Sequence, residues 1–179
     1  SEIYGPGIRS VFWTQGCTLA CKGCWNTQFW SSKGGSQIKV SQILSELDEL
    51  DDIEGITLLG GEPLQQAEAT LALIEGCKQR GLSIFLYTGY NPSGFDAIMQ
   101  ACFDASDIAV TGRYVQELRD TTLRWRGSRN QQVHFISDAY DESVLQEQTE
   151  VECHILPSGE IRMVGYAEPE LVGILGVLL

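Results

Sequence analysis

The chain of 179 residues has the length of one domain, so we expect a single domain over residues 1–179. Its residues are 43% hydrophobic and 20% charged, which is typical of a globular protein and excludes a chain that is disordered throughout. The formal net charge of −12 argues against nucleic acid as a primary partner, because a phosphate backbone attracts cations.

No apolar run approaches the length of about 20 residues that a membrane-spanning helix needs. The first residues lack the basic start and the apolar core of a secretory signal, so we expect a cytoplasmic protein in a reducing compartment. Three of the six cysteines lie within eight consecutive residues. In a reducing compartment, such clustering indicates metal binding rather than disulfide bonds.

Short apolar runs alternate along the chain with stretches whose apolar residues recur at helical spacing. The expected elements, in chain order, are a strand at 8–15, a helix at 39–50, a strand at 55–59, a helix at 64–80, a strand at 82–87, a helix at 95–103, strands at 108–110 and 133–137, a weak helix at 142–148, and a β-hairpin of residues 151–156 and 161–166.

This alternation predicts an α/β fold with βα units around a parallel sheet. The chain is too short for a closed eightfold barrel, which takes about 250 residues. An incomplete, open parallel β/α barrel or a short doubly wound sheet remains, with the β-hairpin added at the C-terminal end. In either fold the functional loops lie at the carboxyl ends of the strands.

The first predicted strand is followed by three cysteines in a CxxxCxxC spacing, Cys17, Cys21 and Cys24. Three thiolates on one loop can hold three corners of a 4Fe-4S cluster and leave the fourth iron without a protein ligand. Structural zinc takes four protein ligands, so a zinc site would need another ligand from a distant part of the chain. We expect the remote cysteines to be small apolar core residues: Cys77, Cys102 and Cys153.

The second predicted strand ends in residues 60–63, Gly-Gly-Glu-Pro. Together with the cysteine motif, this segment resembles the radical S-adenosylmethionine (SAM) superfamily, in which the two motifs follow the first and second strands. The resemblance implies that the open iron of a 4Fe-4S cluster binds the amine and carboxylate of SAM. It also implies that the reduced cluster cleaves SAM to a 5′-deoxyadenosyl radical, and that a one-electron donor such as flavodoxin or ferredoxin supplies the electron.

Three further stretches are similar to the glycyl-radical activating enzymes, especially those of anaerobic ribonucleotide reductase. They are residues 5–9 (GPGIR), 12–17 (FWTQGC) and 126–131 (RGSRNQ). The resemblance implies an open radical SAM barrel and a backbone glycine of a glycyl-radical enzyme as the hydrogen donor. It assigns no catalytic residue. It places eight residues at SAM: Trp25, Gly60, Gly61, Glu62, Thr88, Thr111, Ser128 and Asn130.

The chain departs from the activating-enzyme pattern at Tyr4, where Asp is usual, and at Trp25, where His or Tyr is usual. One alternative is therefore the same cleavage of SAM acting on a different peptide or a small molecule. A non-enzymatic alternative is an electron-transfer module or a zinc-stabilised binding module. Neither of these modules would bind SAM.

Five of the eight arginines fall within residues 112–130, which gives this segment a local charge of +3 in an acidic protein. Arginine favours bidentate contacts with anions, so the segment could bind a carboxylate or a phosphate, or dock a partner. The alternative is a solvated loop with surface ion pairs. The acidic residues between 46 and 54 are interpreted as a solvated helix end.

Overall fold

The structure is a computed structural model that describes residues 1–146, 151–159 and 161–165. Its strands are β1 (Arg9–Thr14), β2 (Gly55–Gly60), β3 (Ser83–Tyr87), β4 (Ile108–Thr111), β5 (Gln132–Phe135), β6 (Val151–Ile155) and β7 (Ile161–Gly165). The α-helices are α1 (Val40–Leu47), α2 (Ala67–Lys78) and α3 (Ala97–Asp104). The loops contain five short 3₁₀ turns, η1 (Thr27–Phe29), η2 (Pro63–Gln66), η3 (Pro92–Gly94), η4 (Gln116–Leu118) and η5 (Glu142–Gln146).

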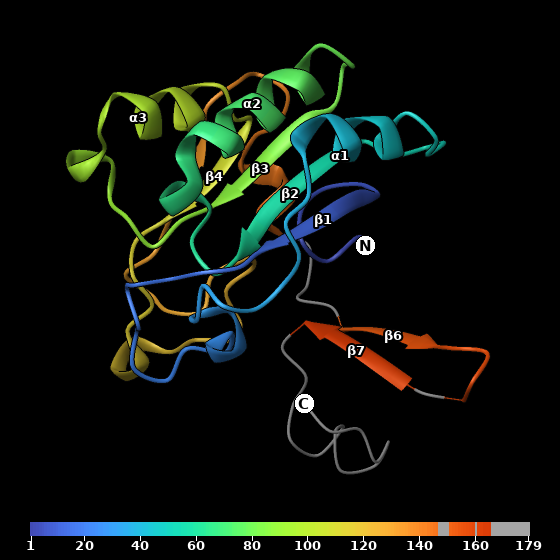
Figure 1. Ribbon diagram of the computed structural model, residues 1–179. Coiled ribbons are helices and arrows are strands. Elements are labelled where there is room, and N and C mark those ends of the chain that lie inside the picture. Colours follow the sequence, from blue (N-terminus) through green and yellow to red (C-terminus); the bar gives the residue numbers. More distant parts are fainter. Residues whose placement is uncertain (147–150, 160, 166–179) are drawn as a thin grey trace.

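The first five strands form one sheet in the order β1-β2-β3-β4-β5 (Figure 1). Strands β1 to β4 run parallel, whereas β5 pairs antiparallel with β4 and places Gln132 opposite Thr111. The prediction of an all-parallel sheet is therefore wrong for β5. A parallel neighbour needs a crossover connection, usually a helix, and residues 112–131 form only the turn η4 and loops.

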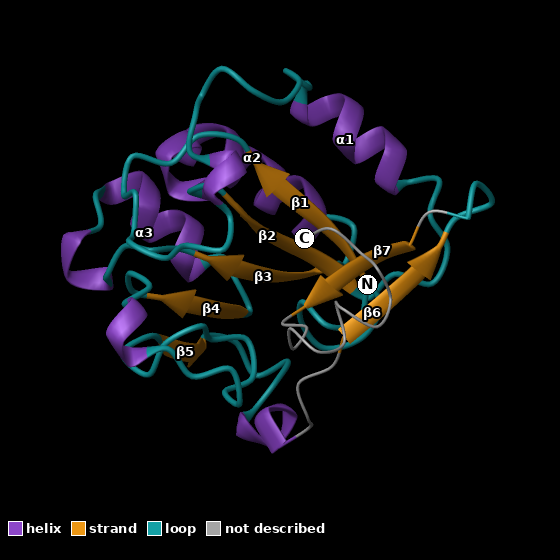
Figure 2. Cartoon of the chain, turned by 90° about the horizontal axis from the view of Figure 1, so that it is seen from below, coloured by secondary structure: helices purple, strands orange, loops and turns teal. Residues whose placement is uncertain are grey.

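The three α-helices cover one face of the sheet (Figure 2). Each βα connection leads to the next strand in the same direction, and crossovers of one hand place every helix on the same side. A doubly wound sheet reverses its strand order, and the five described strands of this sheet show no reversal. The assignment to an open barrel remains a prediction.

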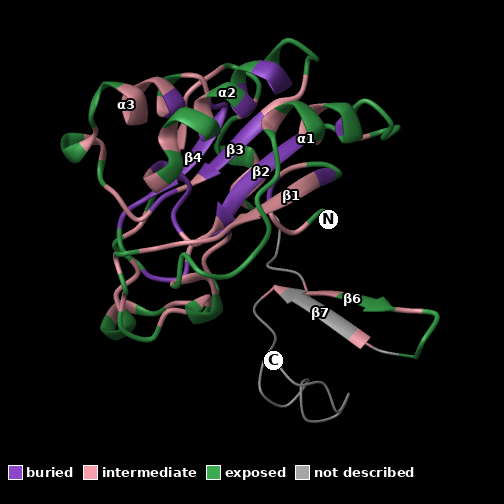
Figure 3. Ribbon diagram, viewed as in Figure 1, coloured by how far each residue is buried: buried purple, intermediate pink, exposed green. Residues whose placement is uncertain are grey.

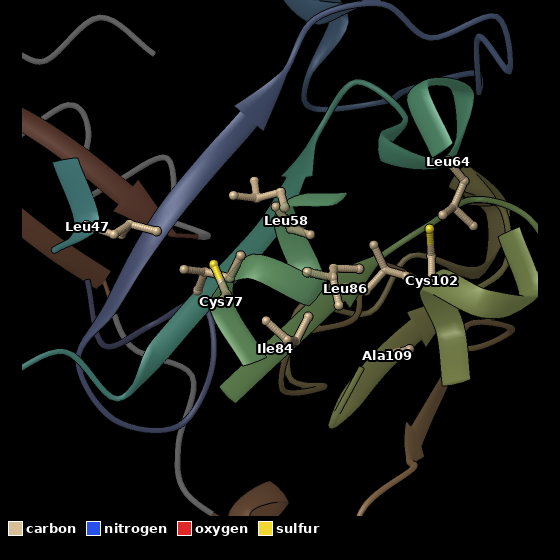
Figure 4. Close-up of a cluster of buried hydrophobic side chains, with 11 residues drawn as sticks. Leu47, Leu58, Leu64, Cys77, Ile84, Leu86, Cys102 and Ala109 are labelled. Carbon is tan, nitrogen blue, oxygen red and sulfur yellow. The ribbon is translucent and has the colours of Figure 1, made fainter. Parts of the chain in front are cut away.

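The helix-facing core is built from alternate residues of the central strands, including Ile56, Leu58, Ile84 and Leu86 (Figure 4). Because β2 is covered on both faces, its residues from Gly55 through Leu59 are all buried (Figure 3). Full burial of one such aliphatic side chain contributes about 1.5–3 kcal/mol.

Two of the remote cysteines lie inside this core. Cys77 of α2 and Cys102 of α3 are fully buried among apolar side chains (Figure 4). Burial raises the pKa of each thiol to about 11, which favours the neutral form over the thiolate that binds metals. Cys153 is exposed on β6, so the prediction of a core residue is wrong for it. Its strand pairs with β7 in a separate two-stranded sheet.

The opposite face of the sheet carries a second, aromatic core. Phe85, Ile108 and Val110 are buried there against Trp125. The ring of Phe85 meets the indole of Trp125 edge-on, with 4.9 Å between the centroids. The chain after β4 therefore folds back across the face that the helices leave open.

The predicted helix at 64–80 begins later than its apolar spacing suggests. Pro63 starts the 3₁₀ turn η2, and the Glu62 carboxylate accepts a hydrogen bond from the Leu64 N–H. Gln66 then has a non-helical backbone, with φ −124° and ψ 41°. The turn η2 and the non-helical residue Gln66 separate the Gly-Gly-Glu-Pro segment from the regular helix α2.

Strands β6 and β7 form an antiparallel hairpin outside the main sheet (Figure 1). The hairpin contacts the beginning of the chain, where the Ser1 hydroxyl donates to the Glu152 carboxylate at 2.5 Å and the Glu2 N–H donates to it at 3.4 Å. Within the described residues, no helix combines the length and the apolar character needed to cross a membrane.

Candidate functional site

The loop after β1 carries three cysteines, Cys17, Cys21 and Cys24. We call residues 16–30 the cysteine loop. Two backbone hydrogen bonds close its base, because the Gly16 N–H donates to the Phe29 carbonyl at 2.9 Å and the Cys17 N–H donates to the Trp30 carbonyl at 3.0 Å. Gly16 has φ +104°, a conformation that costs glycine little. The loop is therefore held at the carboxyl edge of the sheet.

Two of the three sulfur atoms of this loop, those of Cys17 and Cys24, accept hydrogen bonds from backbone N–H groups. The Asn26 N–H donates to Cys24 Sγ at 3.4 Å. Burial raises the pKa of the Cys17 thiol, and hydrogen bonds from the backbone of Leu19 and Ala20 oppose that shift by stabilising the thiolate. Hydrogen bonds to the sulfurs are one means by which proteins tune iron–sulfur clusters.

The donor set fits an iron–sulfur cluster better than a closed zinc site, because it offers three thiols and no fourth ligand within the loop. In the described part of the chain, no three His, Cys, Asp or Glu side chains are already gathered closely enough to hold a metal ion. The three thiols would therefore have to move closer together to hold a cluster.

The Gly60-Gly61 segment lies directly against the base of the cysteine loop. The Gly61 N–H donates to the Thr14 carbonyl at 2.8 Å, and the Glu62 N–H donates to the Gly16 carbonyl at 2.9 Å. A Cβ atom on Gly61 would lie 2.4 Å from the Gly16 oxygen, so a side chain cannot be accommodated without movement of the backbone. Glycine here is required by the close approach of two loops.

Glu62 is buried, and its carboxylate is already occupied by protein donors. It accepts hydrogen bonds from the Leu64 N–H at 3.0 Å, the Thr88 hydroxyl at 2.8 Å and the Gly89 N–H at 2.7 Å. Burial raises its pKa, and the three hydrogen bonds act in the opposite direction by stabilising the charged form. The side chain thus links the loop after β2 to the loop after β3.

The loop after β3 also contacts the cysteine loop. A Cβ atom on Gly89 would lie 2.4 Å from the Leu19 side chain, so Leu19 packs directly over this glycine. Gln65 donates to the hydroxyl groups of Thr18 and Tyr90 and accepts from the Thr18 N–H. Side chains at positions 19 and 65 therefore connect three adjacent loops.

The two threonines that the sequence analysis placed at SAM both have protein partners. Thr88 donates to Glu62 and accepts from the Tyr90 N–H at 3.1 Å. Thr111, at the end of β4, hydrogen bonds to His134 Nε2 at 2.8 Å. Partial burial lowers the pKa of His134, which favours the neutral ring. Both hydroxyls therefore make hydrogen bonds that stabilise the carboxyl edge of the sheet.

Residues 112–131, which we call the arginine segment, are folded by their own RGSRNQ motif. The Ser128 hydroxyl accepts from the Val115 N–H at 3.1 Å, and the Asn130 amide donates to the Arg113 carbonyl at 2.7 Å. Gln131 donates to the Gly112 carbonyl at 3.1 Å. These amide and hydroxyl groups determine the shape of the segment.

The arginine segment lies against the cysteine loop. The guanidinium of Arg119 lies 4.7 Å from the centroid of the Trp25 ring, and Lys22 forms an exposed ion pair with Glu117 at 3.4 Å. Arg113 also donates a hydrogen bond to the Leu19 carbonyl. Both segments lie beyond the arrowheads of the parallel strands in Figure 1. The carboxyl edge is therefore covered by two loops in contact.

The amino-acid sequence of this chain is similar to those of known iron–sulfur and activating proteins. Residues 3–134 match the model of the 4Fe-4S single cluster domain family. The chain is 35% identical over 140 residues to the anaerobic ribonucleoside-triphosphate reductase-activating protein of Haemophilus influenzae, an alignment that covers 74% of this chain and 90% of that protein. The chain belongs to this family of iron–sulfur activating proteins.

Two other activating proteins of this name show the same extent of similarity. The protein of Vibrio cholerae is 36% identical over 140 residues, covering 74% of this chain and 90% of its own length. The protein of enterobacteria phage T4 is 33% identical over 138 residues, with 73% and 86% covered. The family match includes the cysteine loop and the arginine segment and ends within β5, before the hairpin.

All eight residues predicted at SAM lie in loops or strand ends at the carboxyl edge of this activating-protein sheet. Five of them have side chains that are already hydrogen bonded to other parts of the protein: Glu62, Thr88, Thr111, Ser128 and Asn130. Trp25 is 37% exposed and carries Arg119 on its ring. Contact between these residues and SAM remains a prediction.

Three residues that join the loops were not predicted in that role. Leu19, Gln65 and Arg113 make contacts between the loops after different strands. Arg113 was expected only as one of five arginines that could bind an anion or a partner, and no motif or apolar period singles out Leu19 or Gln65. One signal was present for Gln65, because it lies two residues after the Gly-Gly-Glu-Pro segment, inside the 3₁₀ turn that Glu62 caps.

Proposed function

We propose that this activating protein is a radical SAM enzyme. In this proposal the thiolates of Cys17, Cys21 and Cys24 ligate three irons of a 4Fe-4S cluster, and SAM binds at the fourth iron beside Gly60 and Gly61. When bound, the cluster and SAM supply one-electron cleavage of the sulfonium and a 5′-deoxyadenosyl radical that takes a hydrogen atom from the substrate.

One observation supports the proposal most strongly. The Gly-Gly-Glu segment is hydrogen bonded through its backbone to the base of the cysteine loop, so both motifs occupy one place at the carboxyl edge. Glycine at positions 60 and 61 permits this close approach, because a Cβ atom there would lie 2.6 Å from the Thr14 nitrogen and 2.4 Å from the Gly16 oxygen, respectively. Glu62 would hold this backbone in place through Thr88 and Gly89.

Aromatic side chains would limit the access of water to the cluster. Trp13 stacks on Phe29 of the cysteine loop with 5.4 Å between the ring centroids, and Tyr4 meets Trp13 edge-on at the same distance. We infer that this aromatic group lines the concave face of an open β/α barrel. A dry environment protects a reactive radical from quenching by solvent.

We propose a backbone glycine of an anaerobic ribonucleotide reductase as the hydrogen donor, because the similar proteins bear the name of activators of that enzyme. A glycine in a large partner must reach the site from outside. A small one-electron donor, such as flavodoxin or ferredoxin, would have to reduce the cluster before each cleavage.

The test is anaerobic reconstitution with iron and sulfide, followed by reduction with dithionite in the presence of SAM and chromatography for 5′-deoxyadenosine. We expect product from the wild type and from Cys77→Ala, whose thiol is in the core, and none from Cys21→Ala. Equal iron content in the two variants would contradict the assignment of the ligands.

Two further results separate the alternatives. A wild-type protein that holds zinc and shows no heat of SAM binding in calorimetry would be a structural or electron-transfer module. A protein that makes 5′-deoxyadenosine but produces no glycyl radical signal by electron paramagnetic resonance with the reductase would act on another peptide or a small molecule.

A further inference from the structure

The positive charge of this protein is concentrated in two segments of the chain. The cysteine loop with its continuation to residue 33 and the arginine segment together contain seven Lys and Arg and two Asp and Glu, a formal charge of +5. The rest of the chain then has five cations and 22 acids, a formal charge of −17. No Asp or Glu occurs between residues 10 and 45.

The fold brings the two cationic segments together, although about 80 residues separate them in the sequence. The contacts of Arg119 with Trp25 and of Lys22 with Glu117 join them. Within the arginine segment, a bridge pairs Arg119 with Ser128 and the Arg129 N–H donates to the Leu118 carbonyl, so the backbones around residues 119 and 129 run alongside each other.

The cations of this face are available to a partner. Arg113, Arg119 and Arg129 are exposed, and within the described residues none of the three forms an ion pair with a carboxylate. The side chain of Lys22 is 80% exposed, and its pair with Glu117 is of the surface kind that contributes little. We call Lys22, Arg113, Arg119 and Arg129 the basic face.

Acidic residues gather at the other end of the strands. The exposed acids of residues 46–54 lie between the last turn of α1 and the first residue of β2, which places them at the amino edge of the sheet. The protein therefore has a dipole along its strands. A negatively charged macromolecule is attracted to the carboxyl edge and repelled by the amino edge.

We propose that the basic face is the docking site of a small acidic one-electron carrier protein. This inference rests on the proposed function, because the carrier must bring its redox group close to a cluster held by the cysteine loop. Lys22 lies between two of the proposed ligands, Cys21 and Cys24, so a partner on this face lies over the cluster.

The chemistry of the face suits a transient electron-transfer complex. Exposed charges at a rim accelerate association more than they add affinity, and electron-transfer encounters bury small areas. A carrier must leave after giving one electron, so that another can dock. In the proposed step, a reduced flavodoxin loses one electron to become the semiquinone, and the oxidised cluster gains that electron.

The first test is binding of flavodoxin to the reconstituted protein, measured by calorimetry at increasing salt. We expect the dissociation constant to rise about tenfold between about 50 and 300 mM NaCl, because the Debye length falls below about 10 Å over this range. A constant that does not change with salt would overturn the proposal.

Matched variants locate the site. Lys22→Gln, Arg129→Gln and Gln79→Glu each lower the net charge by one, and Gln79 lies after α2 at the opposite, amino edge. We expect the first two to weaken flavodoxin binding about threefold each and Gln79→Glu to leave it unchanged within error. Equal effects of all three would show a response to net charge and overturn the proposed face.

A stopped-flow measurement separates docking from cluster chemistry. We expect Lys22→Gln and Arg129→Gln to slow reduction of the cluster by flavodoxin, with unchanged iron content and an unchanged cluster signal after dithionite. Normal cleavage of SAM with dithionite, but salt-independent flavodoxin binding, would overturn this inference alone. Absence of a cluster in the wild type would instead overturn the proposed function. If binding of the reductase protected the basic face and binding of flavodoxin did not, the face would be a docking site for the reductase and the proposal would be overturned.

Discussion

Two buried charged side chains brace opposite ends of the sheet. Arg9, at the amino end of β1, is 2% exposed and donates hydrogen bonds to the carbonyls of Pro6, Ile56 and Ser83 and to the hydroxyls of Thr57 and Ser83. Glu62, at the carboxyl end, is 1% exposed and accepts three hydrogen bonds. Each connects neighbouring strands or loops.

The difference between the two ends lies in what the bracing supports. Arg9 belongs to the GPGIR segment that precedes the cysteine motif, but β1 places it about 17 Å from the last residue of the strand, Thr14, at about 3.3 Å per residue. Desolvation lowers the pKa of Arg9, and the nearby Tyr140 and Glu54 partly offset this shift. Arg9 therefore supports the fold, whereas Glu62 supports the fold and the loops of the proposed SAM site.

The largest expected loss of stability follows removal of the brace at the amino end. Arg9→Met deletes all of these hydrogen bonds of the guanidinium and leaves buried carbonyl groups without a donor, so we expect a loss of about 3–5 kcal/mol in the free energy of unfolding. Urea denaturation measures it. The folded fraction should keep the wild-type iron content, and a loss of iron beyond the loss of folded protein would contradict the separation of the two ends.

We expect Glu62→Gln to reduce stability less than Arg9→Met does, but to weaken SAM binding. The amide nitrogen would replace one of the two carboxylate oxygens and would face the N–H donor of either Leu64 or Gly89, so we expect a loss of about 1–3 kcal/mol. SAM affinity, measured by calorimetry, should also fall while iron content stays constant. Thr88→Val removes one donor to the same carboxylate and should show a smaller change in both quantities. Unchanged affinity in both variants would remove this brace from the SAM site.

Gly61→Ala tests the contact between the two loops by sterics alone. The added methyl group would lie 2.4 Å from the Gly16 carbonyl oxygen, and we expect a loss of about 1–3 kcal/mol together with weaker SAM binding. Gly94→Ala is the matched control, because nothing lies within 4 Å of a Cβ atom there. Similar SAM affinity in the two variants would show that the close approach of the loops is not needed.

The smallest expected effect is a pH dependence of the free energy of unfolding that arises from Asp107, at the amino end of the sheet. Burial of Asp107 acts to raise its pKa, but hydrogen bonds from Ser137, Lys78 and the Ile84 N–H outweigh it and lower the pKa. A depressed pKa contributes stability above the ordinary carboxyl range, and this is lost as the pH falls through the folded-state value. In acid denaturation, Asp107→Asn should flatten this slope. An unchanged slope would assign the effect to other carboxyl groups.

The helices and strands could be predicted because each depends on the spacing of apolar residues within a short stretch of sequence. Alternation and helical spacing placed β1 to β5 and α1 to α3 within a few residues of their observed ends. The direction of β5 could not be predicted in this way, since it depends on a return of the chain through residues 112–131 rather than on the strand itself.

The positions of the candidate site residues were predictable only as loops. Cys17 and Gly60 had to lie at the same edge, because parallel strands end together. The partners of Glu62, Ser128 and Asn130 could not be predicted, because each hydrogen bond joins or shapes loops whose approach depends on the packed sheet.

By itself the sequence determined the strands and helices, the three thiols on one loop, and the net negative charge, since each depends on neighbouring residues or on simple counting. Only the tertiary structure decided that the arginine segment lies on the cysteine loop, that Glu62 is turned toward Thr88 and Gly89, and that the basic face lies at the carboxyl edge while the acids of residues 46–54 lie at the amino edge. These features join residues that are distant in the chain, and contacts of that kind form only when the sheet brings its loops together at one edge.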